Sequence, residues 1–185
     1  MRRLHNLLIE ILEKILCKSY LLTRFYTNLF KKMTLDEFSM VDLPKDAKIL
    51  VIGCGSIPHT IITLAENKGW RFVGIDKDRE AVKKAKKVIR LFNLEDKVEI
   101  REGDGMDFDV NGYDLIVIAY GVEPKEEILK RIWKNTGKGT KILYRSAWEV
   151  TDPIYGKEKL PSNIYVEKIH YRPDLVKSLL IVKNV

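Results

Sequence analysis

The sequence has 185 residues, 45% of them hydrophobic, and a formal net charge of +7. This length suits one domain with a short appendage, and the apolar content can support a core. Basic residues never stand more than two in a row, so the charge indicates a solvated surface, and nucleic acid is not expected as a partner. No stretch is both long enough and sufficiently uncharged to span a bilayer, so no membrane partner is expected.

The cysteines and the composition indicate the cellular location of the protein and the kind of organism it comes from. Cys17 and Cys54 form no metal-type cluster, and we expect both to be reduced in a cytoplasmic protein without a bound metal. The N-terminus resembles a signal peptide in its two arginines and apolar residues, but charged residues interrupt it and no cleavage pattern follows. The absence of glutamine and the abundance of lysine, glutamate and isoleucine suggest a thermophilic source.

The first 46 residues are expected to form a helical segment that precedes a main domain of residues 47–185. Leucine and isoleucine recur every three or four positions in residues 4–16, which predicts an amphipathic helix. A second apolar pattern runs from Leu21 to Phe30, and Ser19 is placed to break or cap the chain between the two. Packing on the main domain or a second subunit, covering the active site, and lying on a membrane surface are the alternatives for this segment.

A helix start is predicted at the end of this segment. Thr34-Leu35-Asp36-Glu37 has the spacing of a capping box, in which the threonine and glutamate side chains each accept a backbone N–H. The pattern therefore predicts a short third helix near Phe38 and Met40.

The main domain is expected to begin with one βαβ unit. The apolar run Ile49–Ile52 predicts a buried parallel strand, and the tight loop Gly53–Ser56 follows it. Pro58 suits the first turn of the next helix, with Ser56 as its expected N-cap. A second strand over residues 71–75 ends at Asp76, where a carboxylate can accept hydrogen bonds from ribose hydroxyls.

The remaining chain continues the alternation of strands and helices. Asp78 is expected to N-cap a helix that reaches about Phe92, and Pro124 is expected to start another. Strands are predicted over residues 98–101, 113–119 and 140–144. Residues 163–171 and 175–182 should pair as an antiparallel hairpin, because their connection is short. The pattern predicts an α/β fold with a Rossmann-like, doubly wound sheet.

The sequence of the glycine loop restricts which nucleotide cofactors can bind. A dinucleotide fingerprint needs its third glycine where Pro58 stands, which argues against NAD and FAD. S-adenosylmethionine (AdoMet) needs close backbone approach and a carboxylate for its ribose, but it has no pyrophosphate. The stretch resembles class I AdoMet-dependent methyltransferases. The alternative is that the glycines only make a turn and that Asp76 is a solvated strand end.

Three segments should meet at the carboxyl ends of the parallel strands, where such sheets bind ligands. The resemblance to class I methyltransferases implies that Asp104, after the third strand, lies near the adenine amino group. Its structural alternative is an Asx turn between two glycines. The residues expected to bind the cofactor AdoMet are Gly53, Cys54, Gly55, Ser56, Asp76, Lys77, Asp104, Gly105, Met106 and Ala119.

The segment after the fourth strand argues against two classes of base-modifying methyltransferase. Residues 119–122 lack the Asn/Asp-Pro-Pro-Tyr motif of amino-directed nucleic-acid methyltransferases, and no cysteine stands where a catalytic one is expected. These absences argue against both base-modifying classes.

A more specific resemblance lies in the loop Gly53-Cys54-Gly55-Ser56-Ile57-Pro58-His59-Thr60. It resembles the Gly-Ser-Gly-Pro-Leu-Pro-Leu-Thr loop of nicotianamine synthases. Residues 112–114, the segment Leu143–Ala147 and the pair Asp152-Pro153 resemble further segments of that family, and residues 26–38 do so loosely. The resemblance covers roughly residues 25–155.

The resemblance implies transfer of the 3-amino-3-carboxypropyl group of AdoMet to a small amine or amino acid. It implies Glu37 and Tyr26 as catalytic residues, where a capping role and a core position are the alternatives. The acceptor is expected to contact Tyr120, Arg145 and Trp148, with a salt bridge for Arg145 and a core position for Trp148 as alternatives. His59 could face the ligand or be packed or solvated.

Methyl transfer and a non-catalytic role in AdoMet binding or assembly are the alternative functions. A homodimer formed through the N-terminal helices is a further expectation.

Overall fold

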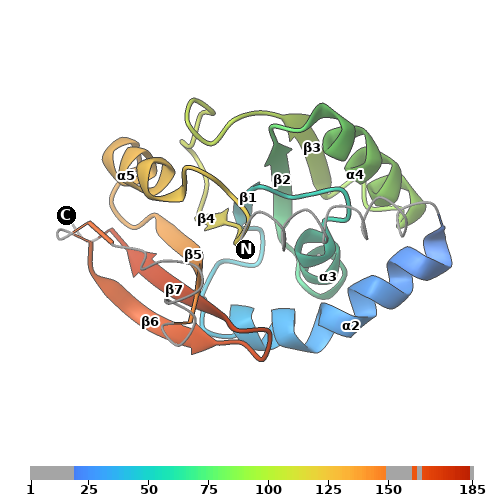
Figure 1. Ribbon diagram of the computed structural model, residues 1–185, viewed down its shortest axis with the longest axis horizontal. Coiled ribbons are helices and arrows are strands. Elements are labelled where there is room, and N and C mark those ends of the chain that lie inside the picture. Colours follow the sequence, from blue (N-terminus) through green and yellow to red (C-terminus); the bar gives the residue numbers. More distant parts are fainter. Residues whose placement is uncertain (1–18, 149–159, 162–163, 184–185) are drawn as a thin grey trace.

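The computed structural model describes residues 19–148, 160–161 and 164–183, and it places their seven strands in one sheet (Figure 1). The strand order is β3-β2-β1-β4-β5-β7-β6. This arrangement confirms the predicted Rossmann-like α/β fold. The strands are β1 (Lys48–Ile52), β2 (Arg71–Asp76), β3 (Val98–Glu102), β4 (Leu115–Ile118), β5 (Lys141–Ala147), β6 (Val166–Tyr171) and β7 (Val176–Val182).

The first five strands are parallel and the last two form the predicted antiparallel hairpin. β1 lies between β2 and β4, and all four residues of its apolar run are buried. β7 inserts between β5 and β6 and is antiparallel to both. β5 extends to Ala147, three residues beyond the predicted strand, because the pairing with β7 continues to that residue. This insertion brings the hairpin turn beside the carboxyl end of β5.

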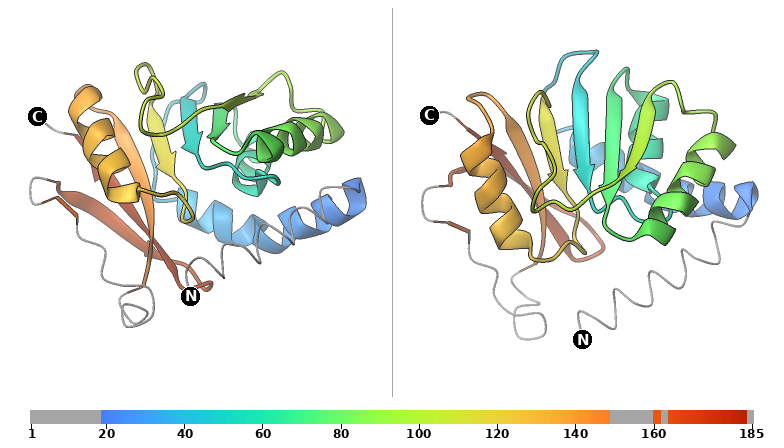
Figure 2. Two further views of the ribbon diagram at one scale, coloured as in Figure 1. Left: turned by 45° about the horizontal axis from the view of Figure 1, so that its top comes forward. Right: turned by 90° about the horizontal axis from the view of Figure 1, so that it is seen from above.

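Helices cover both faces of the sheet. The helices α2 (Tyr20–Phe38), α3 (His59–Asn67) and α4 (Arg79–Leu91) contribute to one apolar cluster, and α5 (Lys125–Asn135) contributes to the other. Figure 2 shows α5 on one side of the sheet and α2 and α3 on the opposite side. The side chain of Asp78 accepts the backbone N–H of Glu80, so the predicted N-cap of α4 is confirmed. Pro58, rather than Ser56, occupies the N-cap position of α3.

The predicted capping box is wrong. α2 is one continuous helix of 19 residues, so Thr34 and Glu37 lie inside it and start no new helix. Thr34 and Glu37 are both fully buried, and α2 packs against α3. A capping box requires free N–H groups at a helix start, whereas here the preceding turns already supply the helical bonds. Ser19 does stand at the N-cap position, although its side chain makes no capping bond.

One face of α2 remains exposed. Leu21, Phe25 and Leu29 recur at helical spacing and expose 76%, 70% and 66% of their surface. Among the described residues no helix combines the length and apolar character that crossing a bilayer requires. The predicted helix over residues 4–16, Cys17 and the Asp152-Pro153 pair lie outside the described residues.

Candidate active site

A cavity of about 500 Å³ opens at the carboxyl ends of the parallel strands and extends to the β6–β7 turn. Its size is typical of small-molecule sites. It brings together most of the predicted site residues: Tyr26, Gly53, Cys54, Gly55, Ser56, Asp76, Lys77, Asp104, Gly105, Ala119, Tyr120 and Arg145. Glu37, Met106 and Trp148 do not line it.

The glycine loop makes a sharp turn after β1. Gly53 and Gly55 have φ angles of +78° and +69°, a region that glycine adopts readily. The backbone N–H groups of Gly53 and Cys54 both donate to the carbonyl of Ile75, which ties the loop to β2. A Cβ on Gly53 would lie 2.4 Å from Cγ2 of Val122. Glycine is therefore required at position 53 by both conformation and space.

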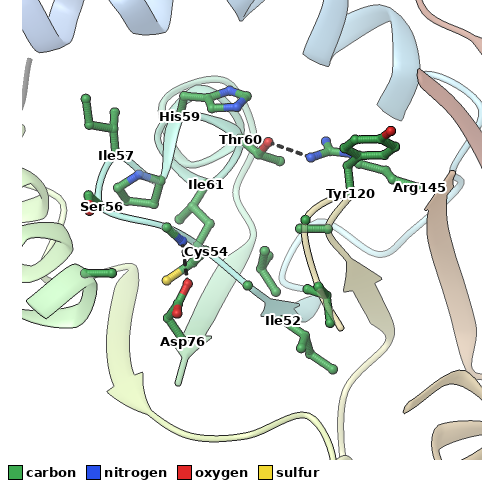
Figure 3. Close-up of a pocket in the computed structure, with 18 of the residues that line it drawn as sticks. Ile52, Cys54, Ser56, Ile57, His59, Thr60, Ile61, Asp76, Tyr120 and Arg145 are labelled. Atoms are coloured by element: carbon green, nitrogen blue, oxygen red, sulfur yellow. Dashed lines mark hydrogen bonds between the residues drawn. The ribbon is translucent and has the colours of Figure 1, made fainter. Parts of the chain in front are cut away.

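Asp76 joins the glycine loop to the end of β2. Its Oδ2 accepts the N–H of Gly55 at 2.9 Å, and its Oδ1 accepts the N–H of Asp78 at 3.0 Å. Figure 3 shows the carboxylate pointing toward the loop from below. Each carboxylate oxygen has a second lone pair, so Asp76 can still accept ribose hydroxyls from the cavity.

The third predicted segment turns sharply after β3. Oδ1 of Asp104 accepts the N–H of Met106 at 2.9 Å, so the Asx turn is present and Asp104 also lines the cavity. A Cβ on Gly105 would lie 2.9 Å from Ile52, which shows close packing below the segment. Met106 points elsewhere and is 40% exposed. The turn thus matches the structural alternative for Asp104, while Asp104 and Gly105 line the cavity and Met106 does not.

Two further predicted cofactor residues border this half of the cavity. Lys77 follows Asp76, and its Nζ donates to the carbonyl of Glu123 at 3.3 Å. Ala119 follows β4 and donates its N–H to the carbonyl of Ile52. Both residues therefore help to close the cavity between β2 and β4.

Arg145 forms the other end of the cavity from the end of β5. Its Nε and Nη2 donate to the two carboxylate oxygens of Glu37 at 2.8 and 2.7 Å. Its Nη1 donates to Oγ1 of Thr60 at 3.1 Å, a bond drawn in Figure 3. This bidentate geometry is typical of an arginine that holds a carboxylate, and it matches the salt-bridge alternative for Arg145. In the structure the carboxylate that it holds belongs to α2.

Glu37 is the centre of a buried charge network. Besides Arg145, its carboxylate accepts a 3.0 Å bond from Nη1 of Arg172 and a short bond from the hydroxyl of Ser178. Burial raises the pKa of Glu37, but the charges of Arg145 and Arg172 and the bonds from Arg145 and Ser178 outweigh it and lower the pKa overall. Glu37 is therefore an ionised group behind the cavity wall, and this geometry suits a positioning role through Arg145.

Sequence reasoning missed Arg172, Asp174 and Ser178. Nε and Nη2 of Arg172 donate to the carboxylate of Asp174 at 3.2 and 2.7 Å, within the turn between β6 and β7. Arg172 and Asp174 both line the cavity. The sequence does offer a signal for these residues. Arg172 and Asp174 carry opposite charges on either side of Pro173, in the turn before β7, the strand that pairs with β5.

Aromatic rings surround His59, the residue that begins α3 just after the glycine loop. The ring of His59 lies 5.8 Å from that of Tyr26, edge to face, and 5.0 Å from that of Phe30. All three residues line the cavity. Burial, followed by the positive charges of Arg145 and Arg172, lowers the pKa of His59 to about 3, although Glu37 opposes this. His59 is therefore a neutral imidazole, and it both faces the cavity and packs on aromatic rings.

The remaining two predicted acceptor residues differ in position. Tyr120 lines the cavity, and Nζ of Lys125 lies 4.8 Å from the centre of its ring. Trp148 instead packs edge to face on Tyr171, and its indole N–H donates to the carbonyl of Val176 at 3.0 Å. Trp148 is half-buried and belongs to neither apolar cluster, so it takes neither the predicted place in the cavity nor a core position. Within the described ranges, no group of three or more His, Cys, Asp or Glu side chains could hold a metal ion.

The comparison that decides the family is a sequence match. The profile of the family described as "Nicotianamine synthase protein" matches residues 20–184, nearly the whole chain. The chain belongs to the nicotianamine synthase family. The resemblance inferred from the glycine loop is therefore confirmed. No curated protein sequence gives a significant match.

Solved structures of this family share the fold. A mutant of MtNAS in complex with S-adenosylmethionine superposes with a TM-score of 0.85 and 19% identity, over 100% of this chain and 76% of that chain. MtNAS in complex with MTA and tNA superposes with a TM-score of 0.82 and 19% identity, over 100% of this chain and 74% of that one. These similarities extend the family assignment to the three-dimensional fold.

Methyltransferases share the same sheet. An RNA methyltransferase from Salinibacter ruber in complex with S-adenosyl-L-homocysteine superposes with a TM-score of 0.67 and 18% identity, over 84% of this chain and 93% of that chain. The predicted class I methyltransferase type of the sheet is thereby confirmed, and this member of the nicotianamine synthase family shares it.

Proposed function

We propose that this chain is an AdoMet-dependent transferase that moves the 3-amino-3-carboxypropyl group of AdoMet to a small amine or amino acid. The observation that carries the proposal is the family match over residues 20–184, which includes the whole glycine loop. The names of the similar structures agree with it, since MtNAS has been crystallised with S-adenosylmethionine and with MTA and tNA.

The cavity supports AdoMet as the cofactor. Asp76 has lone pairs that can accept the ribose hydroxyls, and Asp104 and Gly105 line the cavity after β3, which supports them as the residues on the adenine side. Ile57 and Pro58 replace the small third residue of a methyltransferase loop, and both are buried. This stiffer loop offers a different seat to the methionine end of AdoMet, which can turn the γ-carbon rather than the methyl group toward an acceptor.

The reaction is a displacement at a carbon next to the sulfonium. The acceptor nitrogen attacks the γ-carbon, the bond from carbon to sulfur breaks, and its electron pair neutralises the sulfur, which leaves methylthioadenosine. Positioning of the two reactants supplies much of the rate of such a step. Tyr26 lines the cavity and keeps its predicted catalytic role, whereas the predicted role of Glu37 is supported only through its pairing with Arg145.

The nucleoside product tests the proposal. The protein is incubated with AdoMet and a pool of amino acids and small amines, and the nucleosides are separated by chromatography. Methylthioadenosine is the expected product. Accumulation of S-adenosylhomocysteine instead would identify a methyltransferase. A protein that binds AdoMet in calorimetry but releases neither nucleoside with any acceptor would have the non-catalytic role.

The oligomeric state and the location of the protein stay predictions. The exposed side chains of Leu21, Phe25 and Leu29 support a homodimer formed through the N-terminal helices. Sedimentation of the wild-type chain and of a Phe25→Glu variant would test it, since a monomeric wild type would contradict the prediction. A cytoplasmic location remains an expectation from the cysteines alone.

A further inference from the structure

The turn between β6 and β7 places a carboxylate at the end of the cavity that Arg145 borders. Asp174 lines the cavity, and its side chain exposes 31% of its surface. The backbone N–H of Arg172 donates to the carbonyl of Val176 at 2.8 Å, which closes the turn, and the Arg172 guanidinium donates to both carboxylate oxygens of Asp174. These bonds leave a second lone pair on each oxygen, so Asp174 can still accept hydrogen bonds from a ligand.

The two arginines beside Asp174 present less of their charge to the cavity. The side chains of Arg145 and Arg172 expose only 7% and 5% of their surface. Every guanidinium nitrogen of both arginines already donates to a side chain of the protein, namely Glu37, Thr60 or Asp174. An anionic ligand group would therefore compete with the carboxylates of the protein, whereas a cationic group would meet the exposed oxygens of Asp174.

The charges along the whole cavity also favour a cation. Among the described residues, five carboxylates and three cationic side chains line it. Besides Asp174, the carboxylates are those of Asp76, Asp78, Asp104 and Glu123, and Lys77 joins the two arginines. A cleft with an excess of one charge attracts ligands of the opposite charge. The other four carboxylates follow β2, β3 and β4, so Asp174 is the one that the β6–β7 turn brings to the end beside Arg145.

We propose that Asp174 binds an ammonium group of the acceptor substrate, and that the acceptor carries a second amine, which is the nucleophile. This inference rests on the proposed function. A carboxylate stabilises the charged form of an ammonium beside it and raises its pKa, so a nitrogen held by Asp174 is a poor nucleophile.

The other nitrogen of the acceptor therefore attacks. It first loses a proton to water, and its lone pair then forms the bond to the γ-carbon of AdoMet. The bond between carbon and sulfur breaks and leaves its electron pair on the sulfur, and the new secondary ammonium loses its proton to water. Asp174 orients the acceptor through the ammonium that does not react, and it takes no proton itself.

Matched pairs of amines test this on the wild-type protein without turnover. The protein is saturated with methylthioadenosine, and 1,4-diaminobutane, butylamine, lysine and norleucine are titrated into it by calorimetry at neutral pH. 1,4-Diaminobutane differs from butylamine, and lysine from norleucine, by one added amino group. We expect the added group to strengthen binding about tenfold or more in at least one pair, as a hydrogen bond to a charged group does. A smaller gain in both pairs, or no binding of any probe, would overturn the proposal.

Substitutions at position 174 separate this role from a structural one. Asp174→Asn removes the charge but keeps the size, so it should abolish most of the gain from the added amino group. It should leave the affinity for AdoMet within about twofold, because the nucleoside side of the cavity is distant. Asp174→Glu keeps the charge and should retain most of the gain.

Asp109→Asn is the matched control, because it makes the same change of charge at an exposed residue that does not line the cavity. It should leave every affinity unchanged. The same gain in the wild type and in folded Asp174→Asn protein would overturn the inference, and the wild-type pairs test it alone if that variant does not fold. Absence of methylthioadenosine from the reaction with AdoMet would overturn only the proposed reaction.

Discussion

Arg145 and Glu37 form a bidentate ion pair inside the protein, although 108 residues separate them in the sequence. Their side chains expose 7% and 0% of their surface. The pair joins the end of β5 to the last turn of α2, so a residue that lines the cavity is held by a helix that precedes the sheet. Burial of both charges makes each partner dependent on the other.

Replacing Glu37 should therefore be costly. Glu37→Gln leaves the charges of Arg145 and Arg172 without their common carboxylate, and the expected loss is about 3–5 kcal/mol of unfolding free energy. Denaturant titration measures it. Glu66→Gln is the control, because both carboxylate oxygens of Glu66 accept bonds from Nη1 of Arg24 in a more exposed position. A surface ion pair contributes about 0–1 kcal/mol to the free energy of unfolding. Equal losses of unfolding free energy in the two variants would contradict the prediction that the buried Glu37 network stabilises the fold.

Alanine substitution at Gly53 can be compared with the same substitution at Gly112, which serves as its control. Gly53→Ala combines an unfavourable positive φ with a Cβ 2.4 Å from Val122, so we expect loss of AdoMet binding together with destabilisation. Gly112 has a similar φ of +74° and nothing within 4 Å of an added Cβ. Gly112→Ala should thus cost only the conformational term, about 1–2 kcal/mol, and leave binding intact. Calorimetry with AdoMet distinguishes the two, and similar binding by both would show that the loop tolerates displacement.

Replacing Asp76 should weaken ligand binding more than it destabilises the fold. Asp76→Ala removes the acceptor of the ribose hydroxyls and the anchor of the Gly55 N–H, and AdoMet binding should weaken by about 1.5–3 kcal/mol. Asp109→Ala is the matched control, because the exposed Asp109 carboxylate accepts bonds from Asn111 and, among the described residues, does not line the cavity. Unchanged affinity in folded Asp76→Ala protein would show that the carboxylate serves the turn alone.

The lowered pKa of His59 predicts that the free energy of unfolding depends on pH. Its pKa is about 3 in the folded protein, against 6.5 as the ordinary value. Below about pH 6.5 the unfolded chain binds a proton here and the folded chain does not, so stability falls as the pH falls. The limiting slope is about 1.4 kcal/mol per pH unit. Glu37, whose pKa lies below 4.5, contributes only at lower pH.

Denaturant titrations between about pH 6.5 and 5 should therefore show a slope that His59→Leu reduces. The result that would contradict this is an identical slope in the two proteins. The wild-type enzyme would then hold a protonated imidazole in the cavity.

The parts of the site that depend on local sequence were predictable. A strand, a glycine loop and a terminal aspartate follow each other within 29 residues, and the parallel topology places the next turn, at Asp104, beside them. The strand and helix patterns also gave the hairpin at the end of the chain. These features depend on short spacings and on the right-handed connection of parallel strands.

The acceptor end of the cavity could not be predicted in the same way. Glu37, Arg145 and Arg172 meet only because β7 inserts between β5 and β6 and α2 packs on α3. No local spacing reports such contacts. The pattern at Thr34 was misread for the same reason, since a threonine and a glutamate that face a tertiary contact look like a capping box in the sequence alone.

The hydrogen bonds of Asp76 to its own chain have a kinetic consequence. Gly55 and Asp78 fix the carboxylate from within the protein, so its rotamer and the loop need no ordering during association. Encounter with AdoMet should then give a single phase whose observed rate increases linearly with ligand concentration, without the plateau of a slow rearrangement. Selectivity among nucleosides would accordingly lie in how quickly each one leaves.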